Sequence, residues 1–308
     1  MTEAQALAVG AEQAEDQGVG APRSLTSEAM RELRHNWLFW VALGLIVLFV
    51  IMAAVPQLFT HTDPAKAILK LSNTPPSKAQ WFGRDTQGYD VYARTIYGAR
   101  ASILVGVFST LATSLLGVII GTFAAWYGGV SDAIVMRITD IFFAIPFLLG
   151  AILIMTTFPN TVNSNYFVVV GKVVLALSIL GWPGIARLMR GSVLQVKPND
   201  YITAARALGA SPWRIIRSHV IPNAMAPVIV VSMINLGAYI SAEATLSFLG
   251  IGLVSPAISW GVAISDSLNW IRVAPWSLLF PSAFLSLAVL AFIMLGDAVR
   301  DAFDPKTR

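Results

Sequence analysis

The amino-acid sequence predicts an all-α membrane protein with six transmembrane helices. Of its 308 residues, 56% are hydrophobic and only 12% are charged, whereas an ordinary soluble domain carries about 25% charged residues. The apolar residues fall in long runs with few or no charges, which is typical of helices that cross a bilayer. The chain has no cysteine, which excludes disulfides, cysteine metal ligands and a thiol nucleophile.

The N-terminal region, residues 1–36, predicts a disordered cytoplasmic tail followed by an amphipathic lead-in helix. The tail is rich in Ala, Glu, Gln and Gly and has few large apolar side chains, a composition typical of disorder. We do not expect a signal peptide, because the start is acidic and has no apolar core. The lead-in helix, residues 28–35, carries Arg31 and Arg34.

Six apolar runs are long enough to cross a bilayer. The first is residues 37–58, and the others are 102–126, 133–157, 167–189, 224–242 and 278–299. The fourth run contains Lys172, whose long side chain can reach an interface, and Pro183, which can kink a spanning helix. Residues 245–265 are also apolar, but several glycines and Pro256 favour a folded-back loop over a seventh span.

The distribution of Lys and Arg predicts that both termini and the loop after the fourth span are cytoplasmic. That loop and the C-terminal tail, residues 301–308, contain Lys and Arg, whereas the short loop 158–166 has none. Residues 59–99 are then extracytoplasmic, although their basic residues argue the other way and are only partly offset by aspartates. The net charge of +4 is interpreted as basic flanks facing cytoplasm or anionic lipid, and not as a nucleic-acid surface.

The polar loop between the fourth and fifth spans predicts two short helices that meet at a bend. Asn199 or Asp200 can cap the first helix, and Gly209 can take the left-handed conformation at its end. Ser211 can cap the second helix, with Pro212 at its first position, where no N–H is needed. An ordered helix pair in a loop that faces water indicates a docking surface for a soluble partner.

A single acid, Glu243, lies at the outer end of the fifth span. A carboxylate in an apolar run is costly unless it is paired or accepts hydrogen bonds. The following segment contains Ser247, Gly250 and Gly252, and we expect Glu243 to anchor this outer gate loop through the loop's backbone N–H groups. Proton relay and substrate contact remain alternatives.

Two other groups of charged residues are interpreted as structural. Residues 82–94 predict an interfacial turn that is held by Arg–Asp pairs. Arg137 and Asp140 are three residues apart, so they are neighbours on one helix face and can pair with each other or with lipid headgroups.

The sequence offers no catalytic or cofactor-binding motif. A nucleotide-binding P-loop is absent, because Gly171-Lys172 lacks the upstream glycine and is followed by Val173. The three histidines lie in separate regions, so a metal site is not expected. We expect no catalytic residue and no cofactor in this chain, and any ATPase must be another chain.

The loop after the fourth span resembles the signature loop of ABC-importer permeases, which reads Glu-Ala-Ala, three residues, Gly, nine residues and Ile-x-Leu-Pro. Ala204-Ala205, Gly209 and Pro222 match this spacing, and Thr203 replaces the glutamate. The segment from Glu243 to Gly252 resembles the C-type subunit of dipeptide and oligopeptide permeases. The likeness extends from about residue 38 to the C-terminus.

This resemblance implies a type I ABC-importer permease fold with cytoplasmic coupling helices and a transmembrane core domain over residues 100–300. It implies a bacterial cell membrane, a second homologous permease subunit, two ABC ATPases that hold ATP and Mg, and an extracytoplasmic solute-binding protein. The solute would be a peptide or a related small molecule. The residues implied to dock the ATPase are Tyr201, Thr203, Ala204, Ala205, Arg206, Leu208, Gly209 and Trp213.

An ion-coupled secondary transporter is the alternative function. It would require paired acids at the membrane midplane or broken helices in inverted repeats. The sequence shows no convincing repeat and few charges within the spans.

Overall fold

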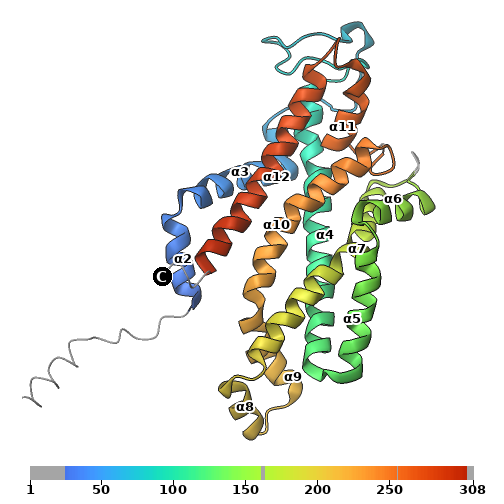
Figure 1. Cartoon of the computed structure of the whole chain (residues 1–308). Coiled ribbons are helices and arrows are strands. Elements are labelled where there is room, and N and C mark those ends of the chain that lie inside the picture. Colours follow the sequence, from blue (N-terminus) through green and yellow to red (C-terminus); the bar gives the residue numbers. More distant parts are fainter. Residues whose placement is uncertain (1–24, 161–163, 255, 304–308) are drawn as a thin grey trace, which may run out of the picture.

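The computed structural model describes residues 25–160, 164–254 and 256–303, and these residues form helices and loops without a β-strand. The helices build an elongated bundle (Figure 1), with α8 (Asp200–Ala207) and α9 (Pro212–Ile215) at one end. The loop between α3 and α4 and the short helix α11 (Trp260–Ser267) lie at the opposite end. Residues 1–24 of the predicted disordered tail lie outside the described residues, whereas residues 25–27, also predicted to be disordered, belong to the first turn of α2.

The N-terminal helices are α2 (Leu25–His35) and α3 (Trp37–Ala54). They are separated at Asn36, whose side chain caps α3 by accepting a hydrogen bond from the Leu38 N–H, at 2.9 Å. The first spanning helix ends at Ala54, earlier than predicted, because Pro56 begins a short 3-10 turn. Arg100 of the next helix donates to the carbonyls at the end of α3, at 2.9 and 3.1 Å, which satisfies orphan helix carbonyls.

The centre of the bundle is the pair α4 (Val91–Tyr127) and α7 (Tyr166–Val196). The two helices approach closely because α4 presents glycine to α7: a Cβ added at Gly117 or Gly121 would overlap Ile185 or Ala186. Helix α4 begins at Val91, well before the predicted span, because the Asp90 side chain caps it.

The third predicted span, 133–157, is wrong as a single helix. The chain forms α5 (Gly129–Ala144) and α6 (Phe147–Thr157), which meet at an angle of 85°. Pro146 explains the break, because proline has no N–H and forces the preceding Ile145 out of the helical region, to φ −90° and ψ 118°. Among the described residues, five helices are long and apolar enough to cross a membrane, or up to six if this bent pair is one span.

The fifth span is much longer than predicted. A π-helical segment (Ile216–Val220) joins α9 directly to α10 (Ile221–Phe248), so one continuous candidate span runs from Pro212 to Phe248. The expected second helix of the docking loop is therefore the first turn of this span.

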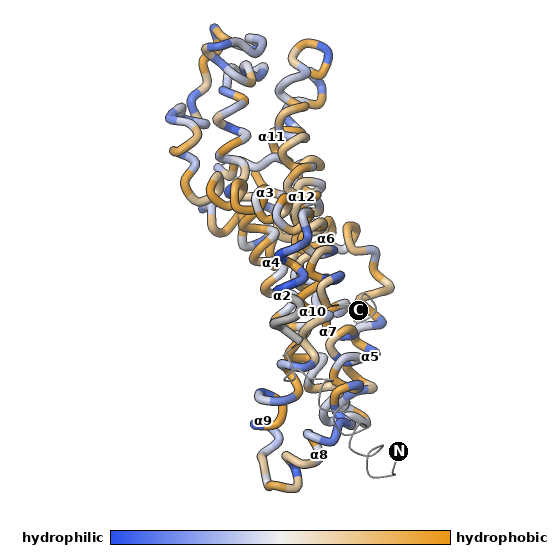
Figure 2. The backbone as a smooth tube through the Cα atoms, turned by 90° about the vertical axis from the view of Figure 1, so that its left-hand side faces the viewer, coloured by the Kyte–Doolittle hydropathy of each residue, from blue (hydrophilic) through white to orange (hydrophobic). Residues whose placement is uncertain are grey.

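The folded-back loop predicted for residues 245–265 is confirmed in outline. The chain leaves α10 after Phe248, returns as α11 and continues into α12 (Trp276–Phe303). Gly261 of α11 lies so close to α10 that an added Cβ would be 2.6 Å from the Ala244 Cα atom. Figure 2 shows hydrophobic residues along most of the bundle and hydrophilic stretches at α8, α9 and the opposite end.

Candidate functional site

The end of the molecule formed by α8 and α9 is held rigidly to the bundle. Ile202, Ile215 and Val220 are buried in one hydrophobic cluster with Met189 and Val193 of α7. The two short helices are thus continuous with the packing of the spanning helices. The short helices therefore share a buried core with α7 and α10.

The bend between α8 and α9 has the predicted geometry. Gly209 has φ +79°, a conformation that glycine adopts without steric cost. The Ser211 hydroxyl accepts a hydrogen bond from the Arg214 N–H at 3.4 Å, and Pro212 occupies the first turn of α9. Asn199 has the backbone conformation of a cap, but its side chain donates to the Tyr201 hydroxyl at 3.1 Å and does not cap α8.

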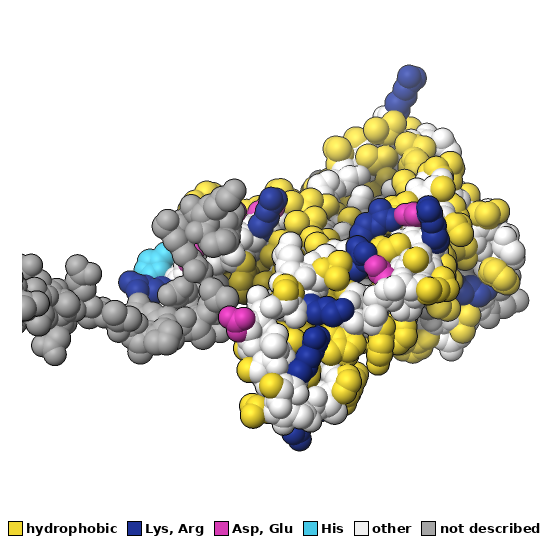
Figure 3. Space-filling view, turned by 60° about the horizontal axis from the view of Figure 1, so that its bottom comes forward, with side chains coloured by type: hydrophobic (Ala, Val, Ile, Leu, Met, Phe, Trp, Pro, Cys, Tyr) yellow, Lys and Arg dark blue, Asp and Glu magenta, His cyan; other side chains and the backbone are white. Residues whose placement is uncertain are grey.

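This end presents large apolar side chains to its surroundings. Tyr201, Leu208 and Trp213 are 41%, 88% and 69% exposed. Thr203, Ala204 and Arg206 are exposed beside them, and Ala205 is half-buried. Figure 3 shows this end brought forward, where Lys and Arg side chains lie among hydrophobic ones. Exposed apolar residues on a rigid, capped helix pair are typical of an interaction surface.

Basic side chains fix the end formed by α8 and α9 to the C-terminus of α4. Lys197 donates to the carbonyls of Ala125 and Trp126 at 3.0 and 2.8 Å. The Arg206 guanidinium lies over the Trp126 ring, 5.0 Å from its centroid. Positive charge near a helix C-terminus is favourable because the helix dipole is negative there. One of the predicted docking residues, Arg206, therefore also holds α8 against α4.

Ion pairs that the sequence did not predict join α5 to α7. Arg190 binds both carboxylate oxygens of Asp132, at 2.5 and 2.6 Å. The predicted Arg137–Asp140 pair is present at 3.6 Å, but Asp140 is closer to Arg187, at 2.6 Å. Residue spacing along one helix could predict the contact of Asp140 with Arg137, but not the contact with Arg187, which tertiary packing brings close.

Glu243 is fully buried near the C-terminal end of α10. Its carboxylate accepts hydrogen bonds from the hydroxyls of Ser102 and Ser247, at 2.8 and 2.7 Å. The expected contact with backbone N–H groups of the loop is thus indirect. Ser247 links the carboxylate to the loop, because its hydroxyl oxygen also accepts a hydrogen bond from the Leu253 N–H at 3.0 Å.

The glycines after Glu243 shape the start of the loop. Gly250 has φ +75° and ends α10 in a left-handed turn. Gly252 approaches α10 so closely that a Cβ would overlap the backbone of Ser247. Glu243, Ser247, Gly250 and Gly252 are therefore linked through Ser247, and their role as an outer gate anchor stays a prediction.

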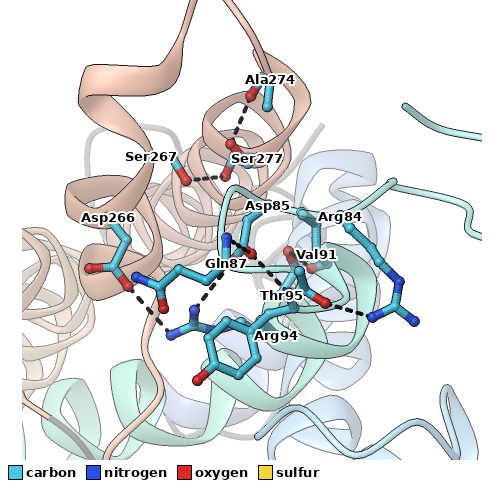
Figure 4. Close-up of polar contacts among 12 residues, drawn as sticks. Arg84, Asp85, Gln87, Val91, Arg94, Thr95, Asp266, Ser267, Ala274 and Ser277 are labelled. Carbon is cyan, nitrogen blue, oxygen red and sulfur yellow. Dashed lines mark hydrogen bonds and ion pairs between the residues drawn. The ribbon is translucent and has the colours of Figure 1, made fainter. Parts of the chain in front are cut away.

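The polar turn before α4 is held by the predicted Arg–Asp pairing. Asp85 accepts from two backbone N–H groups, at 2.8 and 2.9 Å, and lies 3.3 Å from Arg94. Arg94 also reaches Asp266 of α11, at 3.5 Å (Figure 4). Burial raises the pKa of the Asp266 carboxyl, and the nearby Arg94 opposes this shift. Asp266 was missed by sequence analysis because it lies far from Arg94 in the chain.

The bundle of candidate membrane spans is that of an integral membrane protein, and its class follows from the families that the chain matches. Residues 117–308 match the family described as binding-protein-dependent transport system inner membrane component, and residues 24–76 match the N-terminal TM domain of oligopeptide transport permease C. The chain belongs to this family and is an integral membrane permease subunit of an ABC importer.

Curated relatives place the chain close to peptide permeases. The Bacillus subtilis oligopeptide transport system permease protein OppC is 40% identical over 92% of this chain and 91% of its own length. The dipeptide permease protein DppC of the same organism is 40% identical over 92% and 87%. A glutathione transport system permease protein of Pectobacterium atrosepticum is 36% identical over 87% of both chains.

A solved structure supports the fold. The inward-facing MetNI methionine ABC transporter matches with a TM-score of 0.53 and 20% identity, over 68% of this chain and 96% of that chain. The predicted type I permease fold is confirmed.

Proposed function

We propose that this chain is one permease subunit of an ATP-driven importer for dipeptides, oligopeptides or related small solutes. It pairs with a second, homologous permease, two cytoplasmic ABC ATPases and an extracytoplasmic solute-binding protein. The names of the 40% identical relatives support the peptide class. The chain itself carries no chemistry, and ATP and Mg bind to the ATPases.

The observation that carries this proposal is the exposed, tightly packed end of the molecule formed by α8 and α9, which we call the docking end. Leu208 and Trp213 project from helices whose other faces are buried in the core. Ala204 and Ala205 allow a groove to approach α8 closely because their side chains are small. The ATPase groove therefore receives α8 and the start of α9.

Coupling follows from the continuity of the helices. When ATP closes the ATPase dimer, the groove moves and carries α8 and α9 with it. Because α9 continues into α10, and α7 shares the same buried cluster, both spans move together and the solute path opens outward. Nucleotide can drive this change only if it stabilises the two arrangements differently.

The proposed orientation puts α8, α9 and both termini in the cytoplasm of a bacterial cell. The polybasic surroundings of α8 support it, because cytoplasmic loops carry the excess of Lys and Arg. The loop between α3 and α4 and the helix α11 then face the solute-binding protein.

The docking role is tested by replacing one exposed tryptophan. Trp213→Ala should abolish co-purification of the ATPases from detergent extracts while leaving the amount of permease in the membrane unchanged. Trp81→Ala is the matched control, because Trp81 is 65% exposed and lies in the loop between α3 and α4. Equal ATPase recovery with both variants would place the docking site elsewhere.

A further inference from the structure

A cavity of about 520 Å³ lies at the end of the molecule opposite α8 and α9. It is an open cavity, lined by the loop between α3 and α4, the start of α4, the end of α10 with the loop that follows it, and α11. Its volume falls within the range of about 300–1,000 Å³ that is usual for small-molecule sites. It is separate from the docking end, so the ATPase contact does not explain it.

One arginine on the cavity wall is shared by two aspartates. Arg94 lies 3.3 Å from Asp85 and 3.5 Å from Asp266. Asp85 is the better satisfied partner: its side chain is only 12% exposed, and it also accepts two backbone hydrogen bonds. The charge of Arg94 is therefore balanced mainly by Asp85.

The second carboxylate remains open to the cavity. The Asp266 side chain is 40% exposed and lines the cavity directly. One of its oxygens faces Arg94, and the other points away from it (Figure 4). Two carboxylates with one guanidinium leave this corner with a surplus negative charge.

The rest of the described lining does not neutralise that charge. Arg94 is the only basic side chain among the described residues that line the cavity. The uncharged polar side chains come from Gln87, Tyr89, Ser265 and Ser247, and the Ser247 hydroxyl is already bonded to Glu243 and the Leu253 N–H. Aliphatic residues such as Leu253 and Val262 complete the walls. Hydrogen bonds between a carboxylate and a charged ammonium group are short and strong, so an ammonium group suits this corner of the cavity.

We propose that this cavity binds the primary ammonium group of a small organic solute, with Asp266 as its counter-ion and the aliphatic wall against its carbon atoms. This rests on the proposed function, under which the solute is a short peptide and the group is its α-ammonium. The permease then recognises the peptide N-terminus itself, independently of the solute-binding protein.

The test measures binding to the complete transporter, with both permeases and the ATPases, in lipid nanodiscs without the solute-binding protein. The probes are trialanine and N-acetyl-trialanine, which differ in the ammonium group. Loss of one charged hydrogen bond should weaken binding of the acetylated probe by about tenfold or more. In Asp266→Asn this preference should fall to near unity.

Two variants control for folding and for general charge effects. Asp140→Asn removes a carboxylate of similar exposure, 49%, from the ion pair with Arg187, and it should keep the full preference for free trialanine. Asp266→Glu keeps the charge and should also keep the preference. Equal binding of the two probes by the unchanged transporter, an unaltered preference in Asp266→Asn, or loss of preference in Asp266→Glu would overturn the proposal.

Failure of this inference is distinguishable from failure of the proposed function. ATP-driven uptake of trialanine, measured with the binding protein added, reports on the function. If ATP-driven uptake is observed but the binding experiment shows no preference for free trialanine, the cavity's proposed role is refuted and the proposed function stands.

Discussion

Glu243 illustrates how a charge is accommodated within a span at the level of single residues. The carboxylate is fully buried and is satisfied by the hydroxyls of Ser102 on α4 and Ser247 on its own helix. Removing an acceptor from buried donors costs about 1–3 kcal/mol. The network therefore ties α4, α10 and the loop after α10 into one unit.

Substitutions at Glu243 should separate an anchor from a proton carrier. Glu243→Ala should lose most transport and lower thermal stability, because both serine hydroxyls lose their acceptor. Glu243→Gln should keep partial transport, since its amide oxygen still accepts, and neither variant should alter the pH dependence of uptake. A Gln variant as inactive as the Ala variant, with a flattened pH profile, would favour the ion-coupled alternative.

Ser102→Ala provides the matched comparison for this network. Ser109 also lies buried in α4, but its hydroxyl has no hydrogen-bond partner in the described part of the chain. The melting temperature in detergent should therefore fall for Ser102→Ala and change little for Ser109→Ala.

Sequence alone drew attention to several residues with distinctive structural settings but did not predict all of their contacts. The cost of a buried acid identified Glu243, and the spacing of Gly209 and Ser211 predicted the bend correctly. Ser102 and Asp266 were not predicted as partners, because they are distant in the chain and only tertiary packing brings them to Glu243 and Arg94.

At the scale of helices, small residues and prolines decide how the elements fit together. Hydropathy correctly predicted where apolar helices occur, but it underestimated the lengths of α4 and α10. Both helices extend beyond their apolar runs into more polar residues, and hydropathy does not mark such extensions. It also missed the break at Pro146, where an unbroken apolar run hides an 85° bend. A proline within a run can be tolerated, as Pro183 is within α7, so the sequence did not distinguish a kink from a break.

Glycine substitutions should test the close packing of α4 on α7. Gly121→Ala should destabilise the permease by about 1–3 kcal/mol, the usual cost of overpacking, because the added Cβ meets the rigid backbone of Ala186. Gly184→Ala on α7 has no neighbour within 4 Å, and it should be neutral or stabilising by up to about 1 kcal/mol through helix propensity. Thermal unfolding of both purified variants checks this, and equal melting temperatures would show that α4 and α7 are not closely packed.

At the scale of the whole molecule, the two regions to which we assign functions lie at opposite ends of one helical bundle. The end formed by α8 and α9, which we propose docks the ATPase, has exposed apolar and basic side chains, whereas the other end carries the Arg94 cluster and the cavity. The long helices α4 and α10 connect them. This arrangement suits a subunit that transmits movement from one side of a membrane to the other.

The proposed orientation predicts which end is accessible from outside the cell. Because the chain has no cysteine, Ser211→Cys and Lys70→Cys each introduce a single thiol at an exposed position. A membrane-impermeant maleimide should label Lys70→Cys in intact cells and Ser211→Cys only in inverted vesicles. Labelling of Ser211→Cys from outside would reverse the topology and remove α8 as an ATPase contact.

Uptake by the reconstituted transporter tests the central claim most directly. Proteoliposomes containing both permeases and the ATPases, with the solute-binding protein added, are assayed for peptide accumulation with ATP or with an imposed proton gradient. We expect accumulation that requires ATP hydrolysis and is unchanged when the gradient is collapsed. Accumulation driven by the gradient in the absence of ATP would contradict the assignment as the permease of an ATP-driven importer.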